Sequence, residues 1–451
     1  MEAVLKNTDL KPQMAKLGTY VAKMKALDPR KFPDEEFELF SVPSHAEGKP
    51  EVALGKTVGA SKQMVEDDTV LLCKINPRIN RTWVVSSHTG HRKIASSEWM
   101  TFPPSPDFLP QYLGYYLQQD ELRDHLALNA SGVGGSLMRA KPGLIKDYPF
   151  PLFPLPEQRR IVSAIETQLG RLDAAVARLH AAKARLKRYK QAVLKAAVEG
   201  RLTEEWREKN SDVEDAERIV ARIQANRAAT ERTGRKTKTS TPAELDLDSL
   251  PSLPEGWMWS TLPQLGELNR GKSKHRPRDD KRLYDGPYPF VQTGDVRYAN
   301  GLLTEYTATY SEFGLAQSRL WPAGTLCITI AANIADTAVL EFDACFPDSV
   351  VGFIPEEDSI DVHFAELFIR TVKQDIERYA PATAQKNINL EVLRDVAIAL
   401  PPRAEQKEIM RVAGDVLTTI DEMESTLDAQ LLQSTRLRQA VLKRAFEGRL
   451  G

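Results

Sequence analysis

The strongest chemical motif in the sequence is GELNRGKS at 266–273, which fits the phosphate-binding pattern G-x-x-x-x-G-K-[ST]. Such a loop needs a buried strand before it and a helix after it, so that backbone N–H groups point at phosphate. Here Pro263 interrupts the upstream segment, and Pro277 follows within a dense run of charges. No apolar strand ends in an aspartate that would hold a metal ion. A P-loop nucleotide hydrolase therefore remains only an alternative.

Other catalytic constellations are weak. HTGH at 88–91 lacks a second pair of metal ligands, and the glycine-rich SGVGGS at 131–136 is not framed by a strand and a helix. FPPS and LPPR lack the polar residue and the aromatic of the N/D-P-P-Y/F motif that amino-methyltransferases use. Three scattered cysteines, Cys73, Cys327 and Cys345, are too few for a disulfide framework or a four-ligand zinc site. We expect no catalytic residue, no metal site and no cofactor bound by this chain.

The GKS stretch is better suited to contacting the phosphates of a nucleic acid. Basic side chains crowd there without apolar anchors, at Arg270, Lys272, Lys274, His275, Arg276 and Arg278. The whole chain has 61 basic and 62 acidic residues, so a nucleic-acid surface would have to be local. A merely solvated loop explains the same residues equally well.

Strands and helices must position these residues. TVLLCKI at 69–75 and TLCITIA at 325–331 predict buried strands, each with a cysteine acting as a small apolar residue. The segments 111–126 and 363–379 predict amphipathic helices, each followed by an irregular polar stretch. A further helix is expected at 214–232.

An internal repeat organises the chain. QAVLKAAVEGRL at 191–202 returns as QAVLKRAFEGRL at 439–450, and the register extends back to Glu157 and Glu405. Apolar residues at coiled-coil spacing predict two long helices, each with proline before its start and glycine at its end. Convergence of two charged helices on a similar composition is the alternative, but composition alone does not preserve such a string.

Charge blocks predict how the two helices pair. The first carries Lys183, Arg185, Lys187, Arg188 and Lys190, and the second carries Asp421, Glu422, Glu424 and Asp428. Antiparallel pairing, with residue numbers summing to roughly 607, brings Lys187 close to Ile420 and Asp421. Parallel pairing would separate the blocks. The alternative is that the basic block is a solvated face.

A chain of 451 residues predicts two or more domains. The predicted fold is α+β, with two repeated globular α/β domains separated by two long helices that form an antiparallel coiled coil. The expected parts are an N-terminal helical extension (1–29), a first globular domain (30–153), a first long helix (154–202), a charged helical connector and linker (203–252), a second globular domain (253–401) and a second long helix (402–451).

This organisation resembles the DNA-specificity subunit of type I restriction–modification systems over nearly the whole chain. The resemblance is carried by PLPEQRRIVSAIETQLGRLDAAVARL, QAVLKAAVEGRLTEEWREKN, LPEGWMWSTLPQLGEL and the C-terminal AEQKEIMRVAGDVLTTIDEMESTL with RLRQAVLKRAFEGRL. One departure is that no LPEGW-like opening precedes the first globular domain, where ALDPRKFPDEEFELFSVPS stands instead.

The resemblance implies a non-catalytic specificity subunit of an adenine-N6 DNA methyltransferase and endonuclease involved in phage defence. Its two target-recognition domains would each read half of a split double-stranded DNA sequence. The long helices would dock methyltransferase subunits, two in number, and through them restriction and translocase subunits. S-adenosylmethionine, ATP and Mg would be bound by those partners. We expect a cytoplasmic protein with no membrane partner, because no apolar run resembles a signal peptide or membrane span.

DNA-contacting candidates are Arg, Lys, Asn, Gln and Thr in polar turns, because these side chains contact phosphates and base edges. In the first domain they are Lys74, Asn76, Arg78, Asn80, Arg81, Arg139 and Lys141. In the second they are Arg270, Lys272, Lys274, Arg276, Arg278, Gln292, Thr293, Arg297, Lys386 and Asn387. Besides a P-loop hydrolase acting on DNA, a coiled-coil structural adaptor without DNA binding remains an alternative.

Overall fold

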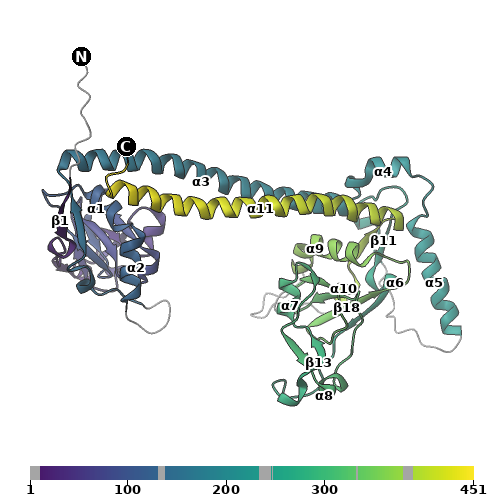
Figure 1. Cartoon of the computed structure of the whole chain (residues 1–451). Coiled ribbons are helices and arrows are strands. Elements are labelled where there is room, and N and C mark those ends of the chain that lie inside the picture. Colours follow the sequence, from purple (N-terminus) through teal and green to yellow (C-terminus); the bar gives the residue numbers. More distant parts are fainter. Residues whose placement is uncertain are drawn as a thin grey trace. The chain divides into compact units, whose positions relative to one another are not determined.

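The computed structural model describes residues 11–130, 138–232, 245, 247–331, 334–378 and 390–450. It divides into two compact units (Figure 1). Unit 1 comprises residues 1–181 and 427–451, and unit 2 comprises residues 182–426. Each unit therefore contains one globular domain together with parts of both long helices. No helix among the described residues is long and apolar enough to cross a membrane.

The globular part of unit 1 is built mainly from short strands. A five-stranded sheet has the order β2-β5-β8-β3-β4, a three-stranded sheet has the order β7-β6-β9, and β1 pairs with β10. The strands are β1 Gln13–Lys16, β2 Ala26–Leu27, β3 Glu36–Phe40, β4 Glu51–Leu54, β5 Lys62–Met64, β6 Val70–Cys73, β7 Thr82–Val84, β8 Arg92–Ala95, β9 Trp99–Phe102 and β10 Pro149–Leu152. The buried strand predicted at 69–75 is thus confirmed as β6, all four residues of which are buried.

Two helices pack the sheets of unit 1 against the long helices. The helix expected at 111–126 is two helices, α1 Pro110–Leu117 and α2 Asp120–Leu128, with a break at Gln118 and Gln119. Tyr112 and Tyr116 of α1 both contact Phe446 edge-on at a centroid distance of 5.1 Å. Their hydroxyls donate hydrogen bonds to the carbonyls of Pro151 and Pro149 in β10. The core of unit 1 is therefore shared between the sheet, α1 and the helix ends.

The N-terminal segment differs from the expected helical extension. Residues 11–29 contain β1 and β2 with a short 3-10 turn at Leu17–Thr19, so the helical prediction is wrong for this part; residues 1–10 lie outside the described structure. β1 pairs antiparallel with β10, directly before the first long helix. In unit 2, β11 Met258–Thr261 pairs in the same way with β19 Ala397–Leu400, directly before the second long helix. The first half therefore contains β1 as the counterpart of β11, although it lacks an LPEGW-like opening.

Unit 2 has a five-stranded sheet of order β12-β18-β16-β17-β14, in which only the β14–β17 pair is parallel. Its further strands are β12 Gly266–Arg270, β13 Tyr284–Phe290, β14 Gly301–Leu303, β15 Ala308–Tyr310, β16 Leu326–Thr329, β17 Thr337–Leu340 and β18 Val350–Pro355. The strand predicted at 325–331 is confirmed as β16. Its Cys327 is fully buried, and burial raises the pKa of that thiol.

The shorter helices of unit 2 are α4 Glu204–Lys209, α5 Ala216–Arg232, α6 Leu262–Leu265, α7 Thr293–Tyr298, α8 Glu312–Ala316, α9 Val362–Arg378 and α10 Leu390–Arg394. The helices predicted at 214–232 and 363–379 are confirmed as α5 and α9. Phe364 and Phe368 of α9 are buried with Ile409 and Ala413 of the second long helix. The globular part of unit 2 is thereby joined to the helix that follows it.

The long helices are α3 Leu155–Val198 and α11 Arg403–Phe446, each of 44 residues. Both end before a glycine in the left-handed region, Gly200 and Gly448, each with φ 73°. The N–H groups of these glycines donate to the carbonyls of Ala197 and Ala445, which would otherwise lack a partner at a helix end. The repeated EGRL string is therefore a helix terminator.

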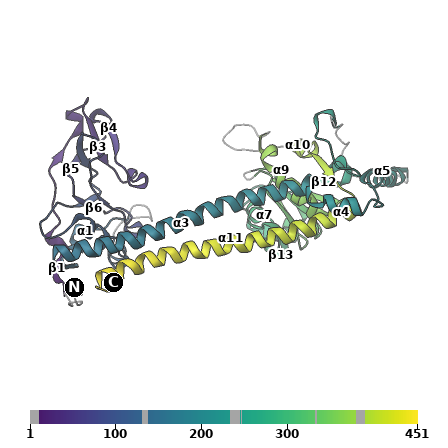
Figure 2. The ribbon, with the colours of Figure 1, turned by 90° about the horizontal axis from the view of Figure 1, so that it is seen from above.

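Within each unit the two helices run antiparallel (Figures 1 and 2). In unit 2, Lys190 pairs with Asp421, and in unit 1, Arg438 pairs with Asp173. The residue numbers of both pairs sum to 611, about one helical turn from the expected 607. The basic-to-acidic contact and the antiparallel direction are confirmed, and so is the α+β fold class with two α/β domains and packed long helices.

Candidate nucleic-acid interface

The two groups of candidate residues in the first domain lie together. Asn76 N donates to the carbonyl of Met138 at 2.8 Å, and Ala140 N donates to the carbonyl of Lys74 at 2.9 Å. Ile75 and Arg139 thus form an isolated antiparallel bridge. The structure thereby places Arg139 and Lys141 beside the segment 74–81, although more than fifty residues separate them in sequence.

Two asparagines shape the turn in this segment. Asn76 and Asn80 have φ values of 47° and 44°, in the left-handed region that asparagine adopts more readily than most residues. They flank a 3-10 helix, Pro77–Ile79, whose Arg78 and Ile79 are exposed. Asn76 and Asn80 therefore form the turn, and Arg78 is the candidate that it presents to solvent.

The cations of this region are not equivalent. Arg139 forms a two-bonded pair with Glu98, with its Nε and Nη2 at 3.1 and 3.0 Å from the carboxylate oxygens, and this hydrogen bonding raises the pKa of Arg139. Lys74, Arg78, Arg81 and Lys141 form no ion pair with other described residues. These four carry the uncompensated positive charge of the region.

In the second domain the basic loop leaves the end of β12 and is held by backbone hydrogen bonds. Gly271 N donates to the carbonyl of Val350, Lys272 N to that of Phe346 and Lys274 N to that of Gln317. A Cβ atom at Gly271 would lie 2.4 Å from the carbonyl oxygens of Phe346 and Pro347, so the close approach requires glycine. The loop is anchored by the protein itself.

This geometry argues against the phosphate-binding alternative. Two of the N–H groups that a P-loop would point at phosphate, those of Gly271 and Lys272, donate to carbonyls of this domain. The next helical element in the described chain is the 3-10 turn Lys281–Leu283, eight residues beyond Ser273. The GELNRGKS motif is therefore a strand followed by a braced loop, and the P-loop interpretation is wrong.

Ion pairs divide the basic loop into compensated and free cations. Asp280 accepts hydrogen bonds from Arg282 and pairs with His275 at 2.8 Å, and the Arg282 guanidinium holds the pKa of Asp280 well below its usual range. Arg278 pairs with Asp348 at 2.8 Å. In contrast, Arg270, Lys272 and Lys274 form no ion pair with described residues, and Arg276 donates only to the carbonyls of Ser273 and His275.

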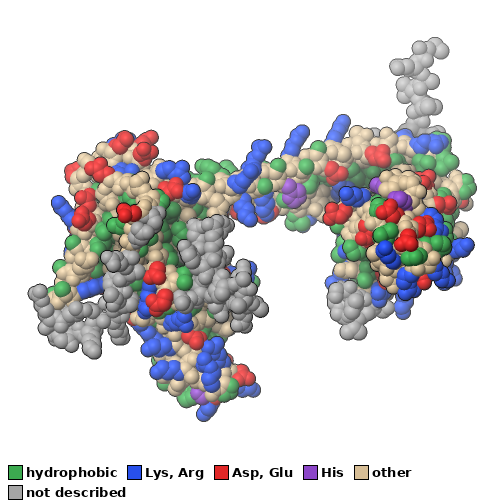
Figure 3. All heavy atoms as spheres, turned by 180° about the vertical axis from the view of Figure 1, so that it is seen from behind, with side chains coloured by type: hydrophobic (Ala, Val, Ile, Leu, Met, Phe, Trp, Pro, Cys, Tyr) green, Lys and Arg blue, Asp and Glu red, His purple; other side chains and the backbone are tan. Residues whose placement is uncertain are grey.

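Figure 3 shows blue side chains gathered over the part of unit 2 where β13 and α8 lie. Sequence reasoning missed two cations of this region, Lys281 and Arg282, although they follow the basic run directly. Arg282 also lies over the ring of Phe313 at 5.0 Å from its centroid. Phe313 lies 31 residues after Arg282 in the sequence, so no local signal indicated this contact.

The remaining candidates of the second domain have different surroundings. Gln292 is the N-cap of α7, where its side chain accepts from the backbone of Asp295 and its own N–H donates to the Asp295 carboxylate at 2.8 Å. Thr293 begins that helix, and Arg297 lies over the ring of Tyr298 at 5.8 Å. Lys386 and Asn387 lie outside the described residues. Gln292 therefore has a capping role, and Arg297 is exposed.

The loop HTGH is a structural feature of the first domain. Glu38, fully buried in β3, accepts from the N–H of His88 at 3.1 Å and from the hydroxyl of Thr89 at 2.6 Å. No group of three or more histidine, cysteine or acidic side chains is arranged to hold a metal ion within the described parts of the chain. The glycine-rich segment 131–136 lies outside them.

The fold defines a class of protein: two α/β domains, each closed by a strand pair at the start of a long helix, with the long helices packed together. A chain from a structure of a type I restriction–modification system superposes with a TM-score of 0.73 at 18% identity, covering 97% of this chain and 98% of that chain. The HsdS subunit from Thermoanaerobacter tengcongensis superposes with a TM-score of 0.53 at 18% identity, covering both chains fully.

Sequence comparisons point to the same family. The model of the type I restriction modification DNA specificity domain matches residues 254–433. The EcoDI specificity subunit of Escherichia coli is 24% identical over 379 residues, which are 82% of this chain and 76% of that protein. The EcoKI specificity subunit of Escherichia coli strain K12 is 23% identical over 332 residues, 72% of this chain and 62% of that protein. Over most of its length the chain is therefore similar to type I restriction–modification DNA specificity subunits, in sequence and in fold.

Proposed function

We propose that the chain reads a bipartite double-stranded DNA target, with one half-site contacted by each globular domain. The observation that carries this proposal is the duplication: each domain has its own terminal strand pair, its own long helix and its own partly or fully exposed cations that form no ion pair with described residues. Phosphate contacts from such cations supply affinity, and neighbouring polar side chains on base edges supply specificity. The cations are Lys74, Arg78, Arg81 and Lys141 in the first domain and Arg270, Lys272, Lys274 and Arg276 in the second.

The proposal includes partners for the long helices. The two helix ends carry the same string in the same structural role, which favours docking of two copies of one subunit, and we assign that subunit as the methyltransferase. S-adenosylmethionine would serve adenine-N6 methylation there, and ATP with Mg would serve restriction and translocase subunits recruited through it. Chromosomal and phage DNA as targets would make the cytoplasm the working compartment.

The proposed domain boundaries follow the strand pairs. The first target-recognition domain extends to residue 153 and includes the strand at 13–16, so that it begins before residue 30. The second covers 253–401. The segments 154–202 and 402–451 are the long helices, and 203–252 connects the two halves.

The test is to map methylated bases in genomic DNA from cells that carry this gene and its partner genes. We expect one split motif, absent when the gene is deleted. Replacing residues 11–153 by the matching region of a relative should change one half of the motif, and replacing 253–401 should change the other. A change of both halves by a single exchange would contradict independent reading, and absence of methylation by the unaltered system would contradict the function.

A further inference from the structure

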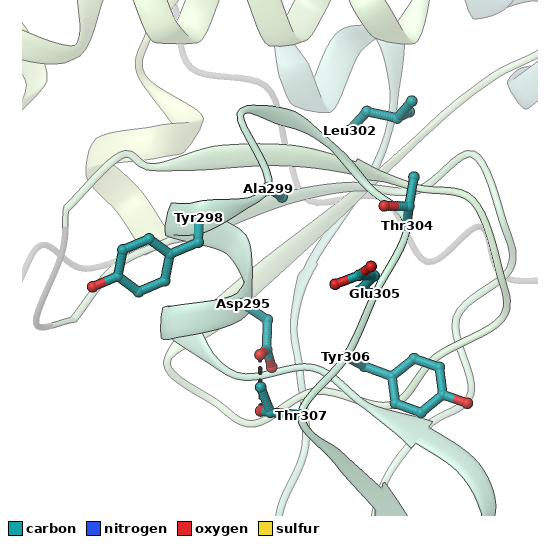
Figure 4. A pocket seen from close by; sticks show the side chains of 8 residues that line it. All are labelled: Asp295, Tyr298, Ala299, Leu302, Thr304, Glu305, Tyr306 and Thr307. Atoms are coloured by element: carbon teal, nitrogen blue, oxygen red, sulfur yellow. Dashed lines mark hydrogen bonds between the residues drawn. The ribbon is translucent and has the colours of Figure 1, made fainter. Parts of the chain in front are cut away.

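A pocket of about 270 Å³ lies in the second domain between α7 and the segment 304–307. It is lined by Asp295, Tyr298, Ala299, Leu302, Thr304, Glu305, Tyr306 and Thr307. Figure 4 shows the carboxylate of Glu305 and the hydroxyl of Thr304 pointing into the space between these two elements, with the rings of Tyr298 and Tyr306 directed outward at either side. The basic-loop candidates are not among the residues that line it.

The walls of the pocket are ordered by contacts of their own. The hydroxyl of Thr307 donates to one oxygen of Asp295 at 2.8 Å, and the backbone N–H of Gln292 donates to the other oxygen at 2.8 Å. The ring of Tyr306 contacts Phe342 edge-on at 5.2 Å. A site whose walls are already held in place loses less entropy when a ligand binds.

The charge of the pocket is negative. Glu305 is exposed and forms no ion pair with any other described residue, and Asp295 uses its oxygens only for neutral donors. Arg297 is the neighbouring cation, and it lies over the outer ring of Tyr298 and is not among the lining residues. Two carboxylates repel the phosphates of DNA, so the pocket favours a cationic ligand.

The apolar rim indicates that the ligand is a protein side chain. Tyr298 is 82% exposed, Tyr306 45% and Leu302 38%, so large side chains with accessible apolar surface lie around the two carboxylates. Tyrosine is enriched at protein interfaces and its ring attracts a guanidinium or ammonium group, as it does for Arg297. The pocket brings together two carboxylates and no larger group of metal-ligating side chains, in keeping with the described residues as a whole.

We propose that this pocket receives an arginine or lysine side chain from the methyltransferase subunit, with Glu305 as the ion-pair partner and the tyrosines packing against its aliphatic stem. The assignment rests on the proposed function, since it takes the partner from there. It gives the second recognition domain a protein-docking site in addition to its DNA-reading loops.

The experiment measures assembly of the full-length chain with its own methyltransferase subunit by titration calorimetry at low and moderate salt. Glu305→Lys should weaken assembly roughly tenfold, and Glu305→Gln or Tyr298→Ala roughly threefold, with the loss for Glu305→Gln fading as salt rises. Glu357→Lys is the matched control, because Glu357 is exposed in the same domain and has no ion pair with described residues. It should leave assembly unchanged.

The affinity of the assembled complexes for the target duplex distinguishes the alternatives. Unchanged DNA affinity per assembled complex, together with weakened assembly, supports the proposal. Unchanged assembly with altered DNA affinity would show that the pocket faces DNA and would overturn it. Unchanged assembly and unchanged DNA affinity would also overturn it. If the unaltered chain does not assemble with the methyltransferase at all, the proposed function itself fails, which is a separate result.

Discussion

The two long helices begin with equivalent residues of the repeat, but these residues have different electrostatic surroundings. In unit 2, Glu405 is fully buried and accepts hydrogen bonds from Thr203 Oγ1 at 2.7 Å, Arg207 Nη2 at 2.7 Å and Trp257 Nε1 at 2.8 Å. In unit 1, the equivalent Glu157 pairs with Arg160 of its own helix, at 2.7 Å, and with no other residue in the described part of the chain. One carboxylate is fully buried in the core, and the other is partly exposed, with 17% of its side chain accessible.

The next residue of each repeat shows the opposite pattern. Gln158 and Gln406 are both fully buried, and each accepts a hydrogen bond from the backbone that begins the domain helix, at Leu109 N and Asp361 N respectively. Each also donates to a carbonyl just before its own long helix, at Phe153 or Pro401. The glutamine therefore joins a domain to its helix identically in both units, whereas the glutamate has diverged because α4 and Trp257 cover only Glu405.

The largest expected difference comes from the two glutamates. Glu405→Ala leaves Arg207 and Trp257 without their buried acceptor, so we expect unit 2 to lose about 3 kcal/mol of stability. Glu157→Ala removes a partly exposed pair and should cost unit 1 less than about 1 kcal/mol. Hydrogen exchange followed by mass spectrometry measures the two units separately.

Glu405→Gln serves as the control for charge, because it keeps one acceptor oxygen. The stability of unit 2 in this variant should lie between that of the unaltered chain and that of Glu405→Ala. Equal losses of protection in the two units after the two alanine changes would mean that burial does not distinguish the glutamates.

The glutamines should behave alike. Gln158→Leu and Gln406→Leu each leave a buried backbone N–H at the start of a domain helix without its acceptor, and each should cost about 2 kcal/mol. Exchange of α1 amides should report the first change, and exchange of α9 amides the second. Gln168→Leu, on the exposed face of α3, is the control and should have little effect. A loss of exchange protection in only one of the two units would show that the two glutamines do not play the same role in joining domain and helix.

Periodicity made the long helices and their antiparallel direction predictable, because heptad spacing and charge blocks are local properties of the sequence. The helix ends were predictable as well, since Gly200 and Gly448 carry the signal themselves. The register could not be predicted in the same way, because a shift of one turn keeps the same apolar seam; the observed ion pairs correspond to a sum of 611.

Neither the first strand nor the ion pairing of the cations could be predicted from the sequence. β1 has four residues, of which Met14 is 60% exposed, so its identity depends on pairing with β10, more than a hundred residues away. Arg139 and Lys74 were both predicted as DNA contacts on residue type alone. The difference between them comes from Glu98, which the fold brings to Arg139, and no spacing in the sequence indicates that pair.

The paired and free cations of the two domains should differ in DNA binding. Changing Lys272 and Lys274 together to alanine should weaken binding roughly tenfold and lower the slope of log affinity against log salt by about 1.8, if each contacts one phosphate. Arg139→Ala should weaken it less than about threefold, because Glu98 already compensates its charge. Anisotropy of a labelled target duplex with the assembled complex, over a series of salt concentrations, measures both values.

Glu98→Gln sharpens the same contrast. It frees the Arg139 guanidinium, so affinity should rise and the salt slope should steepen by up to about 0.9. A fall in affinity would mean that Glu98 orients Arg139 rather than neutralising it.

The smallest expected effects are those of the ion pairs between the long helices. Lys190 with Asp421 in unit 2 and Arg438 with Asp173 in unit 1 have side chains between 28% and 57% exposed, so solvent screens both pairs. Double-mutant cycles to alanine should give coupling energies of about 0.5 kcal/mol in each unit, and both should vanish near about 1 M salt. Arg188→Ala, at an exposed cation without an ion pair to described residues, should show no coupling to Asp421.

A coupling above about 2 kcal/mol that persisted in high salt would mean that these pairs hold the helices together. The small expected value assigns that role to the buried ends, where Gln158, Gln406 and Glu405 lie, and leaves the charge pairs to select the antiparallel direction.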